Sequence, residues 1–281
     1  MSLKQLMVNT AVGRISKSVR DAVKLLHAAR FNPESVGTIA NDQLSEDLVT
    51  RLCKPGKTFL DVGAHIGSFV ASVWHYDRSV NIIAFEAIPE KVASLRKRFP
   101  WAVIHGCAIG DREGTVAFFI DTARSGYSSL GKPPCSSVRE IRVPIRRLDD
   151  LVTTDAVDVI KIDVEGSELG VLRGAERILR KSRPVIMFES AAEDPNRLGY
   201  TKEDLWALLS RLDFATLVPN RVAHNDEGLS CEGFIESHLY PRRTTNYFAI
   251  PKERRVEIRD RARELLGIPS FTKGISPRDG S

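Results

Sequence analysis

Short apolar runs alternate with amphipathic stretches from residue 57 onward, and this alternation predicts the fold. Apolar runs of this length are typical of strands in a sheet that is covered on both faces. The predicted strands are Thr58–Val62, Val80–Glu86, Ala102–His105, Val157–Asp163, Pro184–Glu189, Phe214–Val218 and Thr245–Ile250. The helices predicted between them span about 67–76, 89–99, 167–181 and 201–212, the last opened by a Thr201-x-x-Asp204 capping box. We therefore predict an α/β fold with a doubly wound, mostly parallel sheet, which binds its ligand at the carboxyl ends of the strands.

One internal segment departs from this alternation. Residues 106–156 separate the third predicted strand from the fourth. Within them, Thr115–Ile120 and Arg139–Ile145 are predicted to form an added strand pair, and the small residues of 125–137 a loop between its strands.

A basic amphipathic helix is predicted at the N-terminus, because apolar residues recur there at three- and four-residue steps. These residues are Val12, Ile15, Val19, Ala22, Val23 and Leu26. Such a helix binds a membrane surface or a partner, or it packs its apolar stripe on the main domain. We expect the packed arrangement, with a second helix over about 42–53. We also expect an N-terminal helical segment of residues 1–54, a main domain of residues 55–267 and a frayed tail of residues 268–281.

Composition and charge narrow the class of protein. The chain has 281 residues, of which 42% are apolar and 27% are charged, a mixture typical of globular proteins. We expect a cytoplasmic protein, because the sequence shows neither a secretory signal nor a membrane span and its four cysteines are widely spaced. The net charge of +5 lies entirely within residues 1–31. A nucleic-acid-binding domain usually has its basic excess on the main domain, so nucleic acid is disfavoured as a partner.

A glycine turn follows the first predicted strand. Gly63 and Gly67 allow the backbone to turn tightly and to approach a ligand closely. A dinucleotide fingerprint that began at Gly63 would need glycine where the chain has His65 and Ser68. The turn therefore disfavours a pyrophosphate ligand.

Glu86 ends the second predicted strand, 23 residues after Gly63. An acidic side chain about 20 residues after the glycine turn, at the tip of the neighbouring strand, accepts hydrogen bonds from the hydroxyls of a ribose. Together with the turn, Glu86 predicts a nucleoside site.

Two carboxylates follow the fourth predicted strand. Asp163 and Glu165 lie on one side of the chain as it leaves the strand, which we expect beside the first strand. Both side chains then reach the ligand. The alternatives are acids that favour a helix N-terminus and a site for a divalent ion, but the sequence offers no third ligand, so no metal is predicted.

The chain resembles the FkbM family of S-adenosylmethionine-dependent methyltransferases over about residues 57–190. The resemblance rests on D-V-G-A-x-x-G from Asp61, A-F-E-A-I-P-E from Ala84, R-R-L-D-D-L from Arg146 and D-V-I-K-I-D-V-E-G-S-E-x-x-V-L-x-G from Asp158. It implies a seven-stranded class I methyltransferase domain that transfers a methyl group to hydroxyls of sugars or natural products. Family members commonly have Asn where this chain has His65, and Pro where it has Ala87.

The resemblance also implies roles for individual residues. It implies that the cofactor S-adenosylmethionine is bound by Asp61, Gly63, Ala64, His65, Gly67, Glu86, Ala87, Cys107, Ala108 and Asp163. Asp163 is the first choice for the residue that takes a proton from the acceptor hydroxyl, and His65 is the second. Glu165 faces the acceptor.

The sequence leaves two other functions open. An NAD-linked oxidoreductase could use a similar sheet, although the glycines and a recognisable hydride-transfer pair are missing. A non-catalytic module could bind the cofactor without turnover. The expected partner is a small hydroxylated acceptor, and a homo-oligomer is compatible with the sequence.

Overall fold

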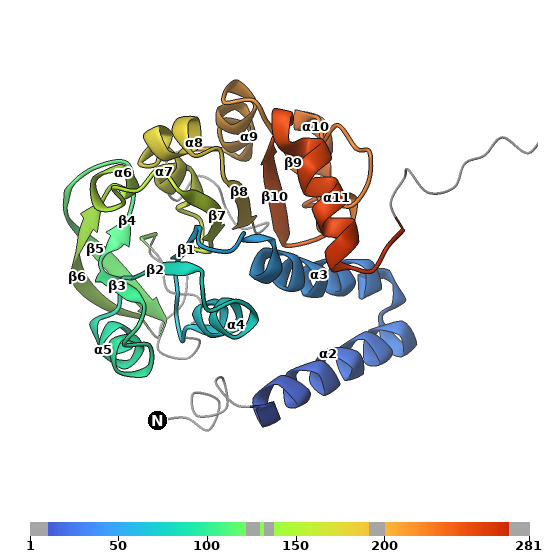
Figure 1. Cartoon of the computed structure of the whole chain (residues 1–281), viewed down its shortest axis with the longest axis horizontal. Helices are drawn as coiled ribbons and strands as arrows, with labels where there is room; N and C mark the ends of the chain where they lie inside the picture. The colour runs from blue at the N-terminus through green and yellow to red at the C-terminus, as the bar shows by residue number, and fades with distance from the viewer. Residues whose placement is uncertain (1–10, 122–129, 132–137, 191–199, 270–281) are drawn as a thin grey trace, which may run out of the picture.

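The computed structural model describes residues 11–121, 130–131, 138–190 and 200–269, with side chains from residue 19 onward. Seven strands form one sheet in the order β3-β2-β1-β7-β8-β10-β9 (Figure 1). They are β1 Thr58–Val62, β2 Asn81–Glu86, β3 Val103–Gly106, β7 Val157–Ile162, β8 Val185–Glu189, β9 Phe214–Leu217 and β10 Asn246–Pro251. Only β10 runs antiparallel to its neighbours in this sheet. The α/β fold is therefore confirmed, and β1 lies between β2 and β7 at the point where the strand order reverses.

Helices cover both faces of this sheet. One face carries α3 Val36–Leu52, α4 Ser68–Tyr76, α5 Pro89–Arg98 and α11 Arg255–Leu265. The other carries α6 Leu148–Leu151, α7 Glu168–Arg173, α8 Glu176–Lys181, α9 Lys202–Arg211 and α10 Cys231–Glu236. Short 3₁₀ turns lie at Pro33–Ser35, Pro219–Arg221 and Lys252–Arg254. Side chains alternate along a strand, so Phe59 packs against the first set of helices and Leu60 against the second.

The single helix predicted over 167–181 is wrong, because the chain breaks between α7 and α8. Gly174 lies at the break, where a Cβ atom would stand 2.0 Å from the carbonyl oxygen of Gly110. At the break, Gly174 packs against Gly110, which follows β4. The sequence around Gly174 does not reveal this contact. The capping box of α9 is confirmed, because the Thr201 and Asp204 side chains each accept the other residue's backbone N–H.

The interrupting segment forms a second, smaller sheet. Its strands are β4 Ala108–Ile109, β5 Gly114–Asp121 and β6 Val138–Arg146, in the order β4-β6-β5. The predicted strand pair is confirmed, because β5 and β6 are antiparallel neighbours. The predicted loop 125–137, apart from residues 130–131, and the tail from residue 270 lie outside the described residues.

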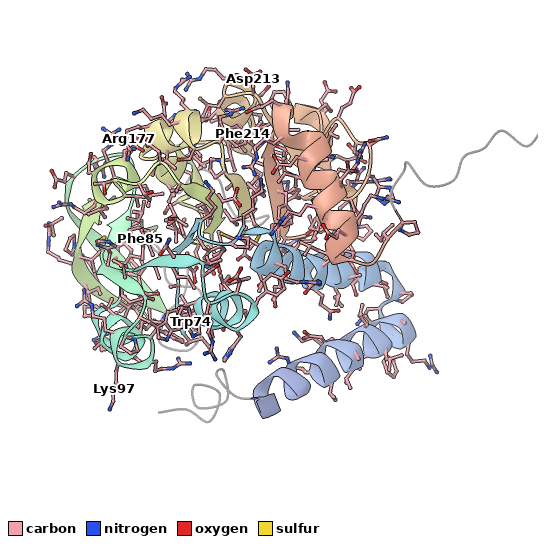
Figure 2. The ribbon with its side chains drawn as sticks, viewed as in Figure 1. Trp74, Phe85, Lys97, Arg177, Asp213 and Phe214 are labelled. Carbon is pink, nitrogen blue, oxygen red and sulfur yellow. The ribbon has the colours of Figure 1, made fainter. Side chains whose placement is uncertain are left out.

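The N-terminal helix α2, Ala11–Phe31, lies apart from the sheet and contacts the body through α3 (Figure 1). The expectation that its apolar stripe packs on the main domain is wrong for the side chains described. Val19 and Val23 are each 57% exposed and Leu26 is 71% exposed, whereas Ala28, on the other side of the helix, is buried. The contact with α3 uses small and polar groups, such as the Asp21 carbonyl oxygen that accepts from Gln43 Nε2 at 2.9 Å. Figure 2 shows side chains of α2 on the side of the helix away from the body as well as on the side toward it.

None of the described helices is both long enough and apolar enough to cross a membrane.

Candidate functional site

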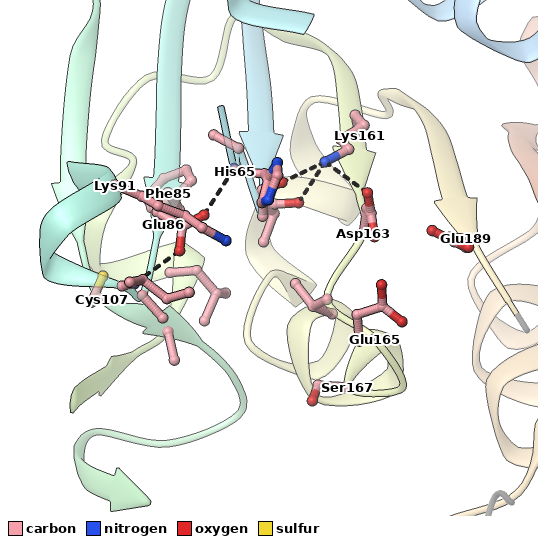
Figure 3. Close-up of a pocket in the computed structure, with 18 of the residues that line it drawn as sticks. His65, Phe85, Glu86, Lys91, Cys107, Lys161, Asp163, Glu165, Ser167 and Glu189 are labelled. Carbon is pink, nitrogen blue, oxygen red and sulfur yellow. Dashed lines mark hydrogen bonds and ion pairs between the residues drawn. The ribbon is translucent and has the colours of Figure 1, made fainter. Parts of the chain in front are cut away.

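A cavity of about 370 Å³ opens at the carboxyl ends of β1, β2 and β7 (Figure 3). Its volume lies within the range of about 300–1,000 Å³ found for small-molecule sites. Nine of the residues predicted from the sequence line it: Gly63, Ala64, His65, Glu86, Ala87, Cys107, Ala108, Asp163 and Glu165. The predicted residues Asp61 and Gly67 are not part of its lining.

Gly63 lets the turn after β1 approach the end of β7. Its φ of +79° lies in the left-handed region, and a Cβ atom would stand 1.8 Å from the Asp163 carbonyl oxygen. The amides of Gly63 and Ala64 both donate to the Phe85 carbonyl oxygen, at 3.0 and 2.9 Å. The turn is thereby fixed to both neighbours of β1, and it forms the floor of the cavity.

Gly67 faces α5 and Phe99, the residue that follows α5. Its φ is also +79°, but a Cβ atom there would meet the Phe99 ring at 2.3 Å rather than the cavity. Gly67 therefore allows the start of α4 to pack closely against α5 and against Phe99, which follows α5. It shapes the site only indirectly.

Glu86 joins the two turns that border the cavity. One carboxylate oxygen accepts from the His65 amide and the other from the Ile88 amide, each at 2.8 Å. Burial raises the pKa of Glu86, while Lys91 and these two amides oppose the rise. Each carboxylate oxygen has a further lone pair, so Glu86 can still accept from two hydroxyls of a ligand. Lys91 reaches the cavity beside it (Figure 3).

Asp61 lies behind the cavity wall, where it pairs with a lysine that the sequence reasoning missed. Asp61 and Lys161 face each other in the register of β1 and β7, and Lys161 Nζ lies 3.1 Å from Asp61 Oδ1. Asp61 is fully buried, and its partner is Lys161. A signal was present in the sequence, since one apolar strand contains the acidic Asp61 and another contains the basic Lys161.

Lys161 connects this buried pair to the cavity. Its ammonium group donates to the Gly63 carbonyl oxygen at 2.7 Å and lies 3.4 Å from Asp163 Oδ2 (Figure 3). Burial by itself would lower the pKa of Lys161, but Asp61 and Asp163 raise it above its usual value. A charged Lys161 therefore positions the Asp163 carboxylate at the edge of the cavity.

Three carboxylates meet at the end of the cavity nearest β8. Oxygens of Asp163, Glu165 and Glu189 all lie within 4.8 Å of one another. Glu189 ends β8, and it lies near Asp163 because β8 pairs with β7. Burial, and then the negative charge of Asp163, raise the pKa of Glu189 to about 9. The cluster can hold a positively charged group of a ligand, and it supplies the third carboxylate that a divalent cation would need.

Ser167 adds a buried hydroxyl group to the lining of the cavity. The residue is 4% exposed and lines the cavity, and its Oγ has no hydrogen-bond partner among the described residues. A buried hydroxyl of this kind is stabilised when a ligand supplies the missing hydrogen bond.

The raised pKa of Glu189 predicts how stability depends on pH. In the unfolded chain Glu189 ionises near 4.5, and in the folded protein it keeps its proton to about 9. Folding thus retains a proton between these values, so Glu189 lowers the stability of the protein progressively as pH rises from about 4.5 to about 9. Glu189→Gln has no such penalty. We expect its melting temperature to gain on that of the parent as pH rises from 5 to 9, whereas exposed Glu203→Gln shows no such trend. A pH-independent difference for Glu189→Gln would contradict this assignment.

Comparison with known proteins gives a family match that spans the site. The model of the methyltransferase FkbM domain matches residues 61–215, more than half of the chain. The chain is 29% identical over 203 residues to hexuronic acid methyltransferase AglP of Haloferax volcanii, covering 68% of this chain and 79% of that protein. It is 26% identical over 161 residues to 2-O-methyltransferase NoeI of Sinorhizobium fredii, covering 50% of this chain and 66% of that protein. A crystal structure of methyltransferase FkbM from Methylobacillus flagellatus aligns at 21% identity with a TM-score of 0.44, covering 69% of this chain and 43% of that one.

Proposed function

Because the chain belongs to the FkbM family of methyltransferases, we propose that it transfers the methyl group of S-adenosylmethionine to a hydroxyl of a sugar or a natural-product-like small molecule. The observation that carries the proposal is one cavity whose lining includes the buried carboxylate of Glu86 and a cluster of three further carboxylates. Two relatives support the kind of acceptor: AglP, as a hexuronic acid methyltransferase, supports a sugar acid, and NoeI, as a 2-O-methyltransferase, supports oxygen as the acceptor atom.

The residues along the cavity fit the parts of this cofactor. Glu86 would accept hydrogen bonds from the two ribose hydroxyls. The apolar side chains of Ile88, Ala108 and Phe118 line the cavity near Glu86 and would border the adenine. The sulfonium and the methionine ammonium are cationic, and they match the carboxylates of Asp163 and Glu165, which lie beside Glu189 at the other end. Ser167 Oγ would gain the hydrogen bond that it lacks.

The chemistry that the chain performs follows from the state of these carboxylates. When bound, S-adenosylmethionine supplies an electrophilic methyl group. Asp163, held beside Lys161, would accept the proton that the acceptor hydroxyl loses. Glu189 keeps its proton at neutral pH and would donate a hydrogen bond to Asp163, while Glu165 would orient the acceptor. Alignment of the two reactants inside a walled cavity supplies a large part of the acceleration.

Glu86→Ala tests the nucleoside assignment. We expect it to weaken S-adenosylmethionine binding by roughly 10–100-fold, because two hydrogen bonds to a charged acceptor are lost. Isothermal titration calorimetry measures the effect, and circular dichroism verifies that the variant is folded. Glu90→Ala is the matched control, since Glu90 is an exposed glutamate nearby that pairs with Arg139 outside the cavity. Parental affinity in folded Glu86→Ala would overturn the ribose assignment.

Product analysis tests the acceptor atom. The protein is incubated with methyl-labelled S-adenosylmethionine and a panel of sugars, sugar acids and their amino and deoxy analogues. We expect label on oxygen and none on an analogue that lacks the reacting hydroxyl. Label on nitrogen or carbon would contradict O-methyl transfer.

A further inference from the structure

The helix α2 has two faces, and only one of them is used within the protein. The face that meets α3 contains buried Ala28 and half-buried Asp21 and Leu25. Val19, Val23 and Leu26 follow one another at four- and three-residue steps, so they form one stripe on the opposite side. Phe31, at the end of the helix, is 63% exposed as well.

This exposure is concentrated rather than scattered. Four of the eleven large apolar residues that are exposed in the described chain lie on the thirteen residues from Val19 to Phe31. No described residue covers the stripe, although the same helix is anchored on its other side. Isolated exposed apolar side chains are normal, but a contiguous apolar stripe is typical of a surface that binds another protein or a membrane.

Charge indicates what the stripe binds. The whole net charge of the chain, +5, lies within residues 1–31. On the helix, Arg20 and Lys24 follow Val19 and Val23 directly, so both basic residues flank the stripe on the same side. Both are exposed, as is Arg30, and Arg20 also lies 3.6 Å from Asp21, the single acidic residue of the segment. The stripe is therefore bordered by positive charge.

A second copy of the chain complements this surface poorly, because each copy would bring the same excess of positive charge. An anionic bilayer complements it in both respects: the headgroups attract the basic flank, and the boundary with the acyl chains accepts the apolar stripe. The helix is too polar to cross the bilayer, so it would lie in the plane of the surface.

We propose that α2 docks the protein on an anionic lipid surface, with Val19, Val23 and Leu26 entering the headgroup region and Lys24 and Arg30 contacting the lipid phosphates. The stripe and its basic flank are separate from the cavity residues, so this proposal stands independently of the methyl-transfer reaction.

Flotation with lipid vesicles tests the proposal on the full chain. The parent protein is mixed with vesicles of phosphatidylcholine alone, or of phosphatidylcholine and phosphatidylglycerol in equal parts. We expect binding only to the anionic vesicles, weakened by added salt. Two double variants, Val23→Ser with Leu26→Ser and Lys24→Glu with Arg30→Glu, each remove one component of the surface. We expect each to lower the affinity more than about tenfold.

Matched control variants distinguish binding through α2 from a nonspecific effect of exposed apolar or charged residues elsewhere on the protein. Val256→Ser removes a valine that is 61% exposed on α11, and Lys97→Glu reverses an exposed charge on α5 (Figure 2). Both should bind anionic vesicles as the parent does. The proposal is overturned if the parent ignores anionic vesicles, if Val23→Ser with Leu26→Ser binds them with parental affinity, or if the controls lose binding equally. It is also overturned if the stripe variants instead dissociate a lipid-free dimer, because a second copy would then be the occupant.

Discussion

Asp163→Asn is expected to lower kcat by roughly 10²–10⁴-fold and to leave the affinity for S-adenosylmethionine almost unchanged. The substitution keeps the size of the side chain and removes its capacity to take a proton. Among the three clustered carboxylates, Asp163 is the one that lies beside a charged lysine, whereas Glu189 already holds a proton at neutral pH. Steady-state kinetics at saturating cofactor measures kcat, and calorimetry measures affinity.

The control and the alternative outcomes make this prediction specific. Asp150→Asn changes an exposed aspartate outside the cavity and should keep parental kcat. If Asp163 only orients the methionine ammonium, cofactor affinity falls and kcat at saturation survives. If the cluster of Asp163, Glu165 and Glu189 binds a divalent cation, a chelator abolishes turnover of the parent and added Mg²⁺ restores it. We expect turnover that resists chelation, and parental kcat in Asp163→Asn would refute the proton-acceptor role.

Lys161→Met is expected to destabilise the protein by about 3–5 kcal/mol, because it leaves a buried carboxylate without its partner. Lys161 is 2% exposed and Asp61 is fully buried, so water cannot replace the lost ion pair. The ammonium also bonds to the Gly63 carbonyl oxygen and lies over the Phe69 ring, 5.4 Å from its centroid. Urea unfolding followed by circular dichroism measures the change.

A double substitution distinguishes the loss of the ion pair from a general packing defect. Asp61→Asn combined with Lys161→Met removes both charges, so we expect it to recover a large part of the stability that Lys161→Met loses. Lys181→Met, at an exposed position on α8, should stay within about 0.5 kcal/mol of the parent. A Lys161→Met protein as stable as the parent would show that the pair does not support the site.

The central strands could be predicted from the sequence, because burial on both faces of a strand requires a run of mainly apolar residues. All residues of β1 and β7 are buried, and buried parallel strands appear as continuous apolar runs. Glu86 and Asp163 were found for a related reason, since a charge directly after such a run falls at the carboxyl edge of the sheet.

Other features depend on contacts between segments that are distant in sequence. Glu189 belongs to the carboxylate cluster because β8 pairs with β7. The sequence does not show which strands pair. The break at Gly174 is set by its approach to Gly110. The apolar residues of α2 have the spacing expected of a packed helix face. This spacing does not determine which face of the helix contacts α3.

Calorimetric titration of the full chain with S-adenosylmethionine, its demethylated product and NAD tests the central claim most directly. The claim predicts that the first two bind at one site per chain with a negative heat-capacity change, that NAD does not bind, and that Glu86→Ala binds the first two more weakly. Binding of NAD without S-adenosylmethionine, or parental affinity for S-adenosylmethionine in Glu86→Ala, would contradict it.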